Sequence, residues 1–544
     1  MSAASTPRRY LVVSDMHLTN GKDPVTGRWT PTEDFFWDEW FRDFLGYHTD
    51  ETPTTLIING DLIDFLQILL PPTAQECQEY GIPSEEINRV YGLRCSESAA
   101  EFQITKTMDG HRVFFEALAA FIGAGNEIVI LKGNHDIQLH WPRVHRRILQ
   151  RLERLCTERG CPFEPARVQF LPWCYLVPGL LYVEHGNQYE ETTAFRNFLH
   201  PLLPLELEGG NPQLELDLSG FLVRYITNRV EPVNPLADNV RPLSKYYKVL
   251  WKEHPLLVMR TFGTAVRFVL KAFAKARQLQ SGTANERYQA IIRQNEAAME
   301  GEARRFAAGN SAEEARLTQA MRAIRARHRT PTLDQGAWKF LGRVVGGVLA
   351  NIWWVLPLYA ITLLPDITLW VKSRIDSLGV AWLSDVAALL MRINLLHVGV
   401  LGVAAVLLLL LRRWIGTGKA DPSASLLPDV SREMRGHADQ IAALLGVRYV
   451  TFGHTHYADV TSMRGGGMYF NTGSWIPVYE EEEQLYRDVR QCTFLRIDGS
   501  GADLLRWNQD ARCPEPVVVM DTETPALEPE ETLLRLLLAA FRKR

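Results

Sequence analysis

The chain has 544 residues, more than one ordinary domain holds, so we expect at least two structural regions. Apolar residues make up 46% and charged residues 22%, which is typical of a foldable chain, and the net charge of -4 gives no reason to expect nucleic acid as a partner. The seven cysteines are scattered and include no Cys-x-x-Cys pair, which argues against a disulfide framework or a structural zinc site and favours a reducing compartment.

The first predicted strand, 10–13, follows a short basic N-terminus almost at once. Its apolar run is too brief for a signal peptide, so we expect the catalytic part of the chain in the cytosol. Asp15 and His17 come directly after the strand, and two donors at this spacing can turn toward one ion. Oxygen and nitrogen donors together suit a divalent metal such as Mn, Fe, Co or Zn. Taken alone, an Asp-x-His pair is more often a surface turn.

The second predicted strand, 55–58, runs through an Asn-Gly pair into Asp61. An apolar, β-branched run that ends in Asn-Gly is typical of a buried strand meeting a tight turn. We therefore expect Asp61 at the carboxyl edge of a sheet, where open α/β folds place their chemistry. A lone aspartate at such a point is often only a turn former or a helix cap.

Three helices are predicted in this half of the chain, at 31–47, 102–122 and 143–159. Gly160 is expected to end the last of them. The stretch 65–99 begins with an apolar run, 65–72, and is then polar and irregular; it either lines a substrate entrance or is a plain surface insertion.

A third strand, 127–131, leads into Asn134, His135 and Asp136. The side-chain carbonyl oxygen of Asn134 can bind a metal, and His135 beside it carries a titratable imidazole. Asp136 can orient that imidazole and hold its tautomer.

Histidines follow two later strands. His185 comes after the strand 180–183, and His454 and His456 come after the strand 447–452. A lone histidine is more often structural, but two at i and i+2 around a glycine-started turn are hard to explain by packing. Further β-structure is expected at 167–170, 458–463 and 468–471, with a hairpin around 498–501.

In chain order these motifs are Asp-x-His, Gly-Asp-x-x-Asp, Gly-Asn-His-Asp, His and Gly-His-x-His, each at a strand end. Together they resemble the five-block signature of the calcineurin-like metallophosphoesterase superfamily, over roughly residues 8–190 and 440–510. The resemblance implies an α/β fold in which a β-sandwich of two sheets is flanked by helices. It also implies two metal ions at the strand ends.

Within the superfamily, the Asp15 and Asp61 blocks and His185 look most like the UDP-2,3-diacylglucosamine pyrophosphatase branch. The chain departs from that branch at two positions. The branch typically carries arginine where this chain has His135, and an acidic residue where this chain has Asn187.

The resemblance also implies roles for individual residues. His135 would be the general acid that protonates the leaving oxygen, or a stabiliser of transition-state charge. Two divalent ions ~3.5–4 Å apart need a shared anionic ligand, and they can acidify a bridging water and clamp phosphoryl oxygens. The expected ions are Mn²⁺, with Fe, Zn, Co or Ni as alternatives. One ion would be held by Asp15, His17, Asp61 and His456, and the other by Asp61, Asn134, His185 and His454, with Asp61 bridging.

Between His185 and His454 the chain is far longer than a connecting loop needs. A basic amphipathic stretch, 255–275, either lies in a membrane interface or packs on the catalytic domain, and 285–329 is expected to form one or two long helices. The predicted division is a first catalytic part at 1–200, a helical insertion at 201–340, a transmembrane hairpin at 341–415, a second catalytic part at 430–515 and an amphipathic tail at 516–544.

Two stretches inside this insertion, 344–364 and 393–411, hold no charged residue. At a rise of about 1.5 Å per residue both approach the ~30 Å hydrocarbon core of a bilayer, so we predict a transmembrane hairpin. A buried core hairpin or an interfacial pair is the alternative. Basic residues crowd the outer flanks, which predicts an inner or cytoplasmic membrane protein whose catalytic domain faces the cytosol.

The sequence therefore predicts a membrane-anchored dinuclear metallophosphoesterase. We expect it to hydrolyse a phosphoester or pyrophosphate bond of a phosphorylated lipid or lipid-linked substrate by metal-activated hydroxide. Two alternatives stay open. One is the same chemistry on a soluble nucleotide or phosphoprotein, and the other is a non-catalytic membrane scaffold that keeps the fold.

Overall fold

The structure is a computed structural model, and the chain divides in it into two compact units. One unit is Met1–Ala337 with Asp429–Met520, and the other is Trp338–Pro428 with Asp521–Arg544. The residues that the structure describes are 8–88, 90–203, 211–228, 282–307, 310–329, 370, 373–377, 430–477, 479–482, 485–488 and 492–517.

Several predicted membrane elements lie outside the described residues. They are the amphipathic stretch 255–275, the hairpin segments 344–364 and 393–411, and the C-terminal tail beyond residue 517. Within the described ranges, no helix combines the length and the apolar character that crossing a bilayer requires.

The first unit contains a seven-stranded sheet in the order β16-β15-β14-β1-β2-β5-β6. β1, β2, β5 and β6 are parallel neighbours, and their carboxyl ends therefore meet at one edge. β2 is buried at all six positions, which explains the apolar, β-branched residues at its centre. The strands are β1 Arg9–Val13, β2 Thr54–Asn59, β5 Glu127–Leu131, β6 Val168–Leu171, β14 Thr493–Asp498, β15 Gly501–Asn508 and β16 Cys513–Pro516.

A second sheet has five strands in the order β10-β11-β9-β8-β7. β8 and β9 are parallel neighbours in it, with Leu181 opposite Tyr449, although the whole insertion separates them in sequence. Val12 and Ile57 of the first sheet share one apolar cluster with Val183 of the second, so the two sheets pack face to face. The strands are β7 Cys174–Val177, β8 Leu181–Glu184, β9 Tyr449–Phe452, β10 Ala458–Ser462 and β11 Met468–Thr472.

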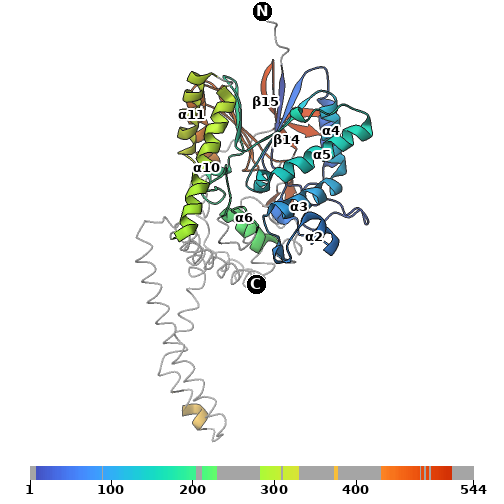
Figure 1. The fold of residues 1–544 in the computed structure, drawn as a ribbon, viewed down its shortest axis with the longest axis vertical. Helices are drawn as coiled ribbons and strands as arrows, with labels where there is room; N and C mark the ends of the chain where they lie inside the picture. Colours follow the sequence, from blue (N-terminus) through green and yellow to red (C-terminus); the bar gives the residue numbers. More distant parts are fainter. Residues whose placement is uncertain are drawn as a thin grey trace, which may run out of the picture. The chain divides into compact units, whose positions relative to one another are not determined.

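Helices cover the other face of the seven-stranded sheet. Leu11 and Ile58 alternate with the residues that face the second sheet, and they share a cluster with Phe114 of α4 and Ile148 of α5. Figure 1 shows α3, α4 and α5 gathered beside β14. The mixed α/β class is thus confirmed. The helices are α1 Asp38–Tyr47, α3 Glu97–Gly110, α4 Arg112–Gly123 and α5 Pro142–Arg159, the last of which ends at Gly160 as predicted.

The remaining elements are short or belong to the insertion. The segment predicted as irregular holds η1 Phe65–Gln67, α2 Ala74–Tyr80, η2 Ser84–Glu86, β3 Ile87–Asn88 and β4 Gly92–Leu93. Loops between the main elements hold η3 Ile137–His140, η4 Pro165–Arg167, η5 Asn187–Tyr189, α6 Leu218–Leu222 and the π-helix η7 Val223–Thr227. The rest are α10 Gly282–Ala307, α11 Ser311–Arg325, α16 Val430–Leu445, β12 Tyr479–Glu482 and β13 Leu485–Asp488.

Two helix predictions are wrong at a common point, the buried imidazole of His111. The predicted helix 102–122 is two helices, because His111 leaves helical geometry between α3 and α4. The predicted helix 31–47 begins only at Asp38, because Glu33 before it accepts backbone N–H bonds from Thr19 and Gly21. His111 joins the two regions, with Nε2 3.0 Å from Glu33 Oε2 and Nδ1 3.1 Å from Asp38 Oδ1.

Replacing His111 by glutamine is expected to destabilise the first compact unit in a pH-dependent way. Burial alone would lower the pKa of His111, but the carboxylates of Glu33 and Asp38 outweigh it and raise that pKa to about 10. Since the pKa lies above its ordinary value of 6.5, the stabilisation is complete below pH 6.5 and is lost as the pH rises toward 10. In urea unfolding at pH 6 we expect the variant to lose about 3–5 kcal/mol of unfolding free energy relative to the wild type. At a pH approaching 10, the loss should be much smaller. An equal loss at both pH values would contradict this account.

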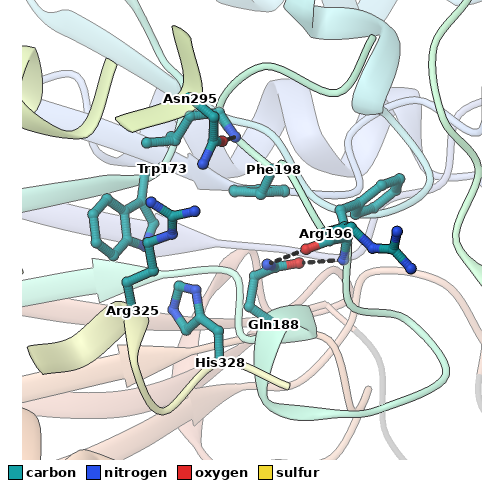
Figure 2. Close-up of a pocket in the computed structure, with 9 residues that line it drawn as sticks. Trp173, Gln188, Arg196, Phe198, Asn295, Arg325 and His328 are labelled. Carbon is teal, nitrogen blue, oxygen red and sulfur yellow. Dashed lines mark hydrogen bonds between the residues drawn. The ribbon is translucent and has the colours of Figure 1, made fainter. Parts of the chain in front are cut away.

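The helices α10 and α11 form a pair, and the chain after α11 returns to the loop that follows β8 (Figure 1). The Arg329 N–H donates to the carbonyl of Gln188 at 2.7 Å, and His328 Nε2 lies 3.2 Å from Glu184 Oε1. From α16, the ring of His437 stacks on that of Tyr189. The residues on either side of the segment 330–429 therefore contact β8 and the loop that carries His185: His328 and Arg329 before the segment, and His437 after it. Figure 2 shows the pocket at this junction, with labelled lining residues Trp173, Gln188, Arg196, Phe198, Asn295, Arg325 and His328.

Candidate metal centre

The residues predicted as metal ligands all follow strands whose ends meet. Parallel strands place their carboxyl ends together, so loops that are distant in sequence converge there. Their side chains form three overlapping groups in which the nitrogen and oxygen donors lie within 4.8 Å of one another. The groups are Asp15, His17 and His456; His17, Asp61 and His135; and Asp61, His185 and His454.

The first group surrounds the two imidazoles of His17 and His456. Their Nε2 atoms face each other at 3.2 Å, and Asp15 Oδ1 lies 3.4 Å from His456 Nε2. Asp61 Oδ2 lies 3.7 Å from His17 Nε2. Asp15 Oδ1 is buried without a hydrogen-bond partner. Two facing imidazole nitrogens beside an unpartnered carboxylate oxygen suit a shared cation.

The group of Asp61, His185 and His454 lies on the other side of Asp61. His185 Nε2 is 3.2 Å from Asp61 Oδ2, while its Nδ1 donates to the backbone carbonyl of Asn59 at 2.8 Å. That bond fixes the tautomer and leaves Nε2 as the lone-pair nitrogen for a metal. His185 Nε2 and Asn134 Oδ1 are both buried without a hydrogen-bond partner. The ring of His454 lies 5.3 Å from that of His185.

Five of the candidate ligands have left-handed backbone conformations, which L-residues rarely adopt. The φ angles are 54° at Asp15, 49° at His17, 50° at Asp61, 71° at His454 and 62° at His456. In the described part of the chain, only two further non-glycine residues have a positive φ. Such strain costs of order 1–3 kcal/mol per residue and tends to cluster at functional sites. The strand-end loops are therefore shaped for the site at the expense of stability.

Two glycines let the carboxylates reach the backbone. A Cβ at Gly133 would overlap Asp61 Oδ1, and one at Gly453 would crowd Asp15 Oδ2. In the space they leave, Asp61 Oδ1 accepts the His135 N–H at 2.9 Å, and Asp15 Oδ2 accepts the His454 N–H at 3.0 Å. One oxygen of each carboxylate is thus tied to the backbone, and the other faces the centre.

The expectation that Asp136 orients the His135 imidazole is wrong. The Asp136 carboxylate accepts the backbone N–H groups of Leu62 and Gly133, at 2.8 and 2.5 Å, and so braces the loops after β2 and β5. Burial, and then the charge of Asp61, raises the pKa of Asp136 to about 7. Its role is to shape the backbone around the site.

Asp64 takes the position that was expected of Asp136. Its Oδ2 lies 2.6 Å from His135 Nδ1 and 3.5 Å from His17 Nδ1, and its Oδ1 accepts the N–H groups that begin η1. The signal was present in the sequence as the second aspartate of Gly-Asp-x-x-Asp. Glu190 is a second residue that sequence reasoning missed, with Oε2 3.0 Å from His454 Nε2. No motif points to it.

The carboxylates of the site hold negative charge that attracts protons or a metal ion. Burial would raise the pKa of Asp15, but His456 and other neighbours lower it to about 2. Burial would likewise raise the pKa of Asp61, but the surrounding imidazoles outweigh it and hold that pKa well below its usual value. Burial would lower the pKa of His185 and His135, but facing carboxylates raise these to about 9 and about 10. Protons thus balance the carboxylates in the absence of metal, and a divalent ion would displace them. The donor set fits a metal ion.

No protein-family model matches this chain, and no curated protein matches it. What the site does is therefore inferred from the chain's own residues.

Proposed function

We propose that the chain is a dinuclear metallophosphoesterase of the calcineurin-like superfamily, which hydrolyses a phosphoester or pyrophosphate bond. One observation carries the proposal. Asp61 lies between two groups of imidazole donors, with Oδ2 3.7 Å from His17 Nε2 on one side and 3.2 Å from His185 Nε2 on the other. A carboxylate shared by two donor sets is what two neighbouring divalent ions require.

The ligand sets follow the strand ends. Asp15, His17, Asp61 and His456 would hold one ion, and Asp61, Asn134, His185 and His454 the other. When bound, the ions supply an acidified water and a clamp for phosphoryl oxygens. Mixed oxygen and nitrogen donors favour Mn²⁺, with Fe, Zn, Co or Ni as alternatives.

His135 is suited to protonate the leaving oxygen. Its Nδ1 is held by Asp64 Oδ2, which leaves Nε2 for the substrate. Its side chain is 17% exposed, whereas that of His17 is 5% exposed, so His135 stands nearer the entrance. A carboxylate behind the ring keeps it protonated and oriented, as a general acid needs.

The two uncharged stretches that the sequence predicts to span a membrane direct the substrate proposal toward lipids. An active site joined to the uncharged stretches 344–364 and 393–411 would work at the cytosolic face of a membrane on a phosphorylated lipid or a lipid-linked pyrophosphate. A soluble nucleotide or phosphoprotein is the alternative target. Comparing hydrolysis of lipid phosphates in detergent with that of soluble phosphoesters decides between them.

Metal removal tests the chemistry. We expect the purified protein to hydrolyse bis(p-nitrophenyl) phosphate, to lose this activity after stripping with a chelator, and to regain it with added Mn²⁺ at about two ions per chain. Undiminished hydrolysis by the metal-free protein would refute the proposal. Metal binding without hydrolysis of any phosphoester would favour the non-catalytic scaffold.

A further inference from the structure

A buried arginine with no ion pair among the described residues belongs to η7, which contacts η1, the short helix that begins after Asp64. Arg224 belongs to the π-helix η7 and is 5% exposed. Its guanidinium donates only at the limit of hydrogen bonding, to Cys95 Sγ at 3.9 Å and to the Gly92 carbonyl at 3.4 Å, and its Nε has no partner. Within the described ranges, no carboxylate forms an ion pair with it.

This arrangement is costly unless something else binds there. An arginine keeps its charge at all physiological pH values, and buried charges in proteins are normally paired. A sulfur atom, one long carbonyl contact and the ring of Tyr225, whose centroid lies 5.8 Å from Cζ, offset only part of the lost hydration. The guanidinium therefore retains most of its capacity to bind an anion.

Two further buried polar atoms without hydrogen-bond partners belong to residues near Arg224 in the fold or in the chain. They are Gln138 Oε1 and Asn228 Oδ1. Gln138 and Arg224 are linked through one sulfur, since Gln138 Nε2 also contacts Cys95 Sγ, at 3.7 Å. Buried polar atoms in proteins are normally satisfied, so the unpartnered atoms of Gln138 and Asn228, together with Arg224 Nε, leave hydrogen-bonding capacity for a ligand here.

The region borders the side of the site on which His135 lies. Asn228 Nδ2 donates to the Leu66 carbonyl at 2.7 Å, and the Leu66 N–H donates to Asp64 Oδ1 at 3.1 Å. The other oxygen of Asp64 holds His135. Gln138, in turn, lies three residues after His135, in η3. Arg224 is thus linked, through neighbouring residues, to both loops that carry Asp64 and His135.

We propose that Arg224 binds an anionic group on the leaving portion of the substrate. The inference rests on the proposed phosphoesterase function. In the hydrolysis, water loses one proton to solvent, its oxygen bonds to phosphorus, the bond from phosphorus to the leaving oxygen breaks, and His135 gives its proton to that oxygen. A phosphate carried by the leaving group would meet the planar guanidinium, which matches two phosphate oxygens at once. The residue would then select substrates with a charged leaving portion.

Two substrates that differ in the leaving group test the role. Bis(p-nitrophenyl) phosphate leaves a neutral or singly charged phenol, whereas a nucleoside diphosphate sugar leaves a phosphate ester. For Arg224→Gln we expect KM for the diphosphate to rise roughly 10- to 100-fold, as the loss of a charge-assisted hydrogen bond predicts. The KM for bis(p-nitrophenyl) phosphate should change less than about twofold. Arg224→Lys should keep part of the wild-type difference between the KM values of the two substrates.

Controls separate this role from a structural one. Arg435→Gln removes an arginine that is paired with Asp459 far from η7, and it should leave the ratio of the two KM values unchanged. Equal effects of Arg224→Gln on both substrates, or none on either, would overturn the inference while leaving the metal chemistry intact. A wild-type protein that cleaves bis(p-nitrophenyl) phosphate but is neither active on nor inhibited by the diphosphate would also overturn it. Failure of the wild type on both substrates would refute the proposed function itself.

Discussion

Asp61→Asn is expected to lower kcat by roughly 10²–10³-fold or more. Removal of one group that stabilises transition-state charge typically has an effect of about this size. The Asp61 side chain contacts donors of both groups, at His17 and His185, so its charge is needed on both sides. Asparagine keeps the size of the side chain and can still accept the His135 N–H, but it carries no negative charge to share between two cations. Metal analysis should show fewer than two ions per chain.

Asp38→Asn is the matched control for Asp61→Asn. Asp38 is also a buried aspartate close to an imidazole, but its partner is His111, away from the strand ends. This variant is expected to lose stability and to keep both metal content and activity per folded molecule. Full metal content and near-normal kcat in Asp61→Asn would rule out a bridging role.

His135→Gln is expected to lower kcat by about 10²–10⁴-fold on substrates with a poor leaving group, the range of general acid catalysis. The reduction should be much smaller with a p-nitrophenol leaving group, because that oxygen needs no proton to depart. Metal content should not change. Asp64→Asn, which removes the partner of Nδ1, should show the same dependence on the leaving group with a smaller reduction.

The metal content of His135→Gln decides between two roles for this histidine. Its ring also lies in a donor group with His17 and Asp61. A large loss of bound metal, with equal effects on good and poor leaving groups, would make His135 a metal ligand and refute the general acid assignment.

Much of the site could be predicted from sequence, for a topological reason. Asp15, Asp61 and Asn134 follow strands that are parallel neighbours, and apolar strand patterns are readable without a structure. Once the strands are assigned, their carboxyl ends must share an edge. His185 and His454 follow the same rule in the second sheet. Polar residues at strand ends are therefore a reliable signal of residues that converge.

Other features could not be predicted, because they depend on contacts between segments that are distant in sequence. The choice between Asp64 and Asp136 as partner of His135 depends on backbone N–H groups from two different loops. The break at His111 depends on Glu33, which lies 78 residues earlier in the chain. No local pattern contains this information.

By itself, the sequence determined the donor types, their order and their places at strand ends, since short apolar runs followed by Asp, Asn or His are local features. Only the tertiary structure decided which oxygen of Asp61 faces the centre, which loops adopt left-handed backbone, and that Arg224 is buried with no ion pair in the part of the chain that the structure describes. These depend on how side chains from separate loops share a small, largely dehydrated space. There, each hydrogen bond made or lost changes the energy far more than local propensity does.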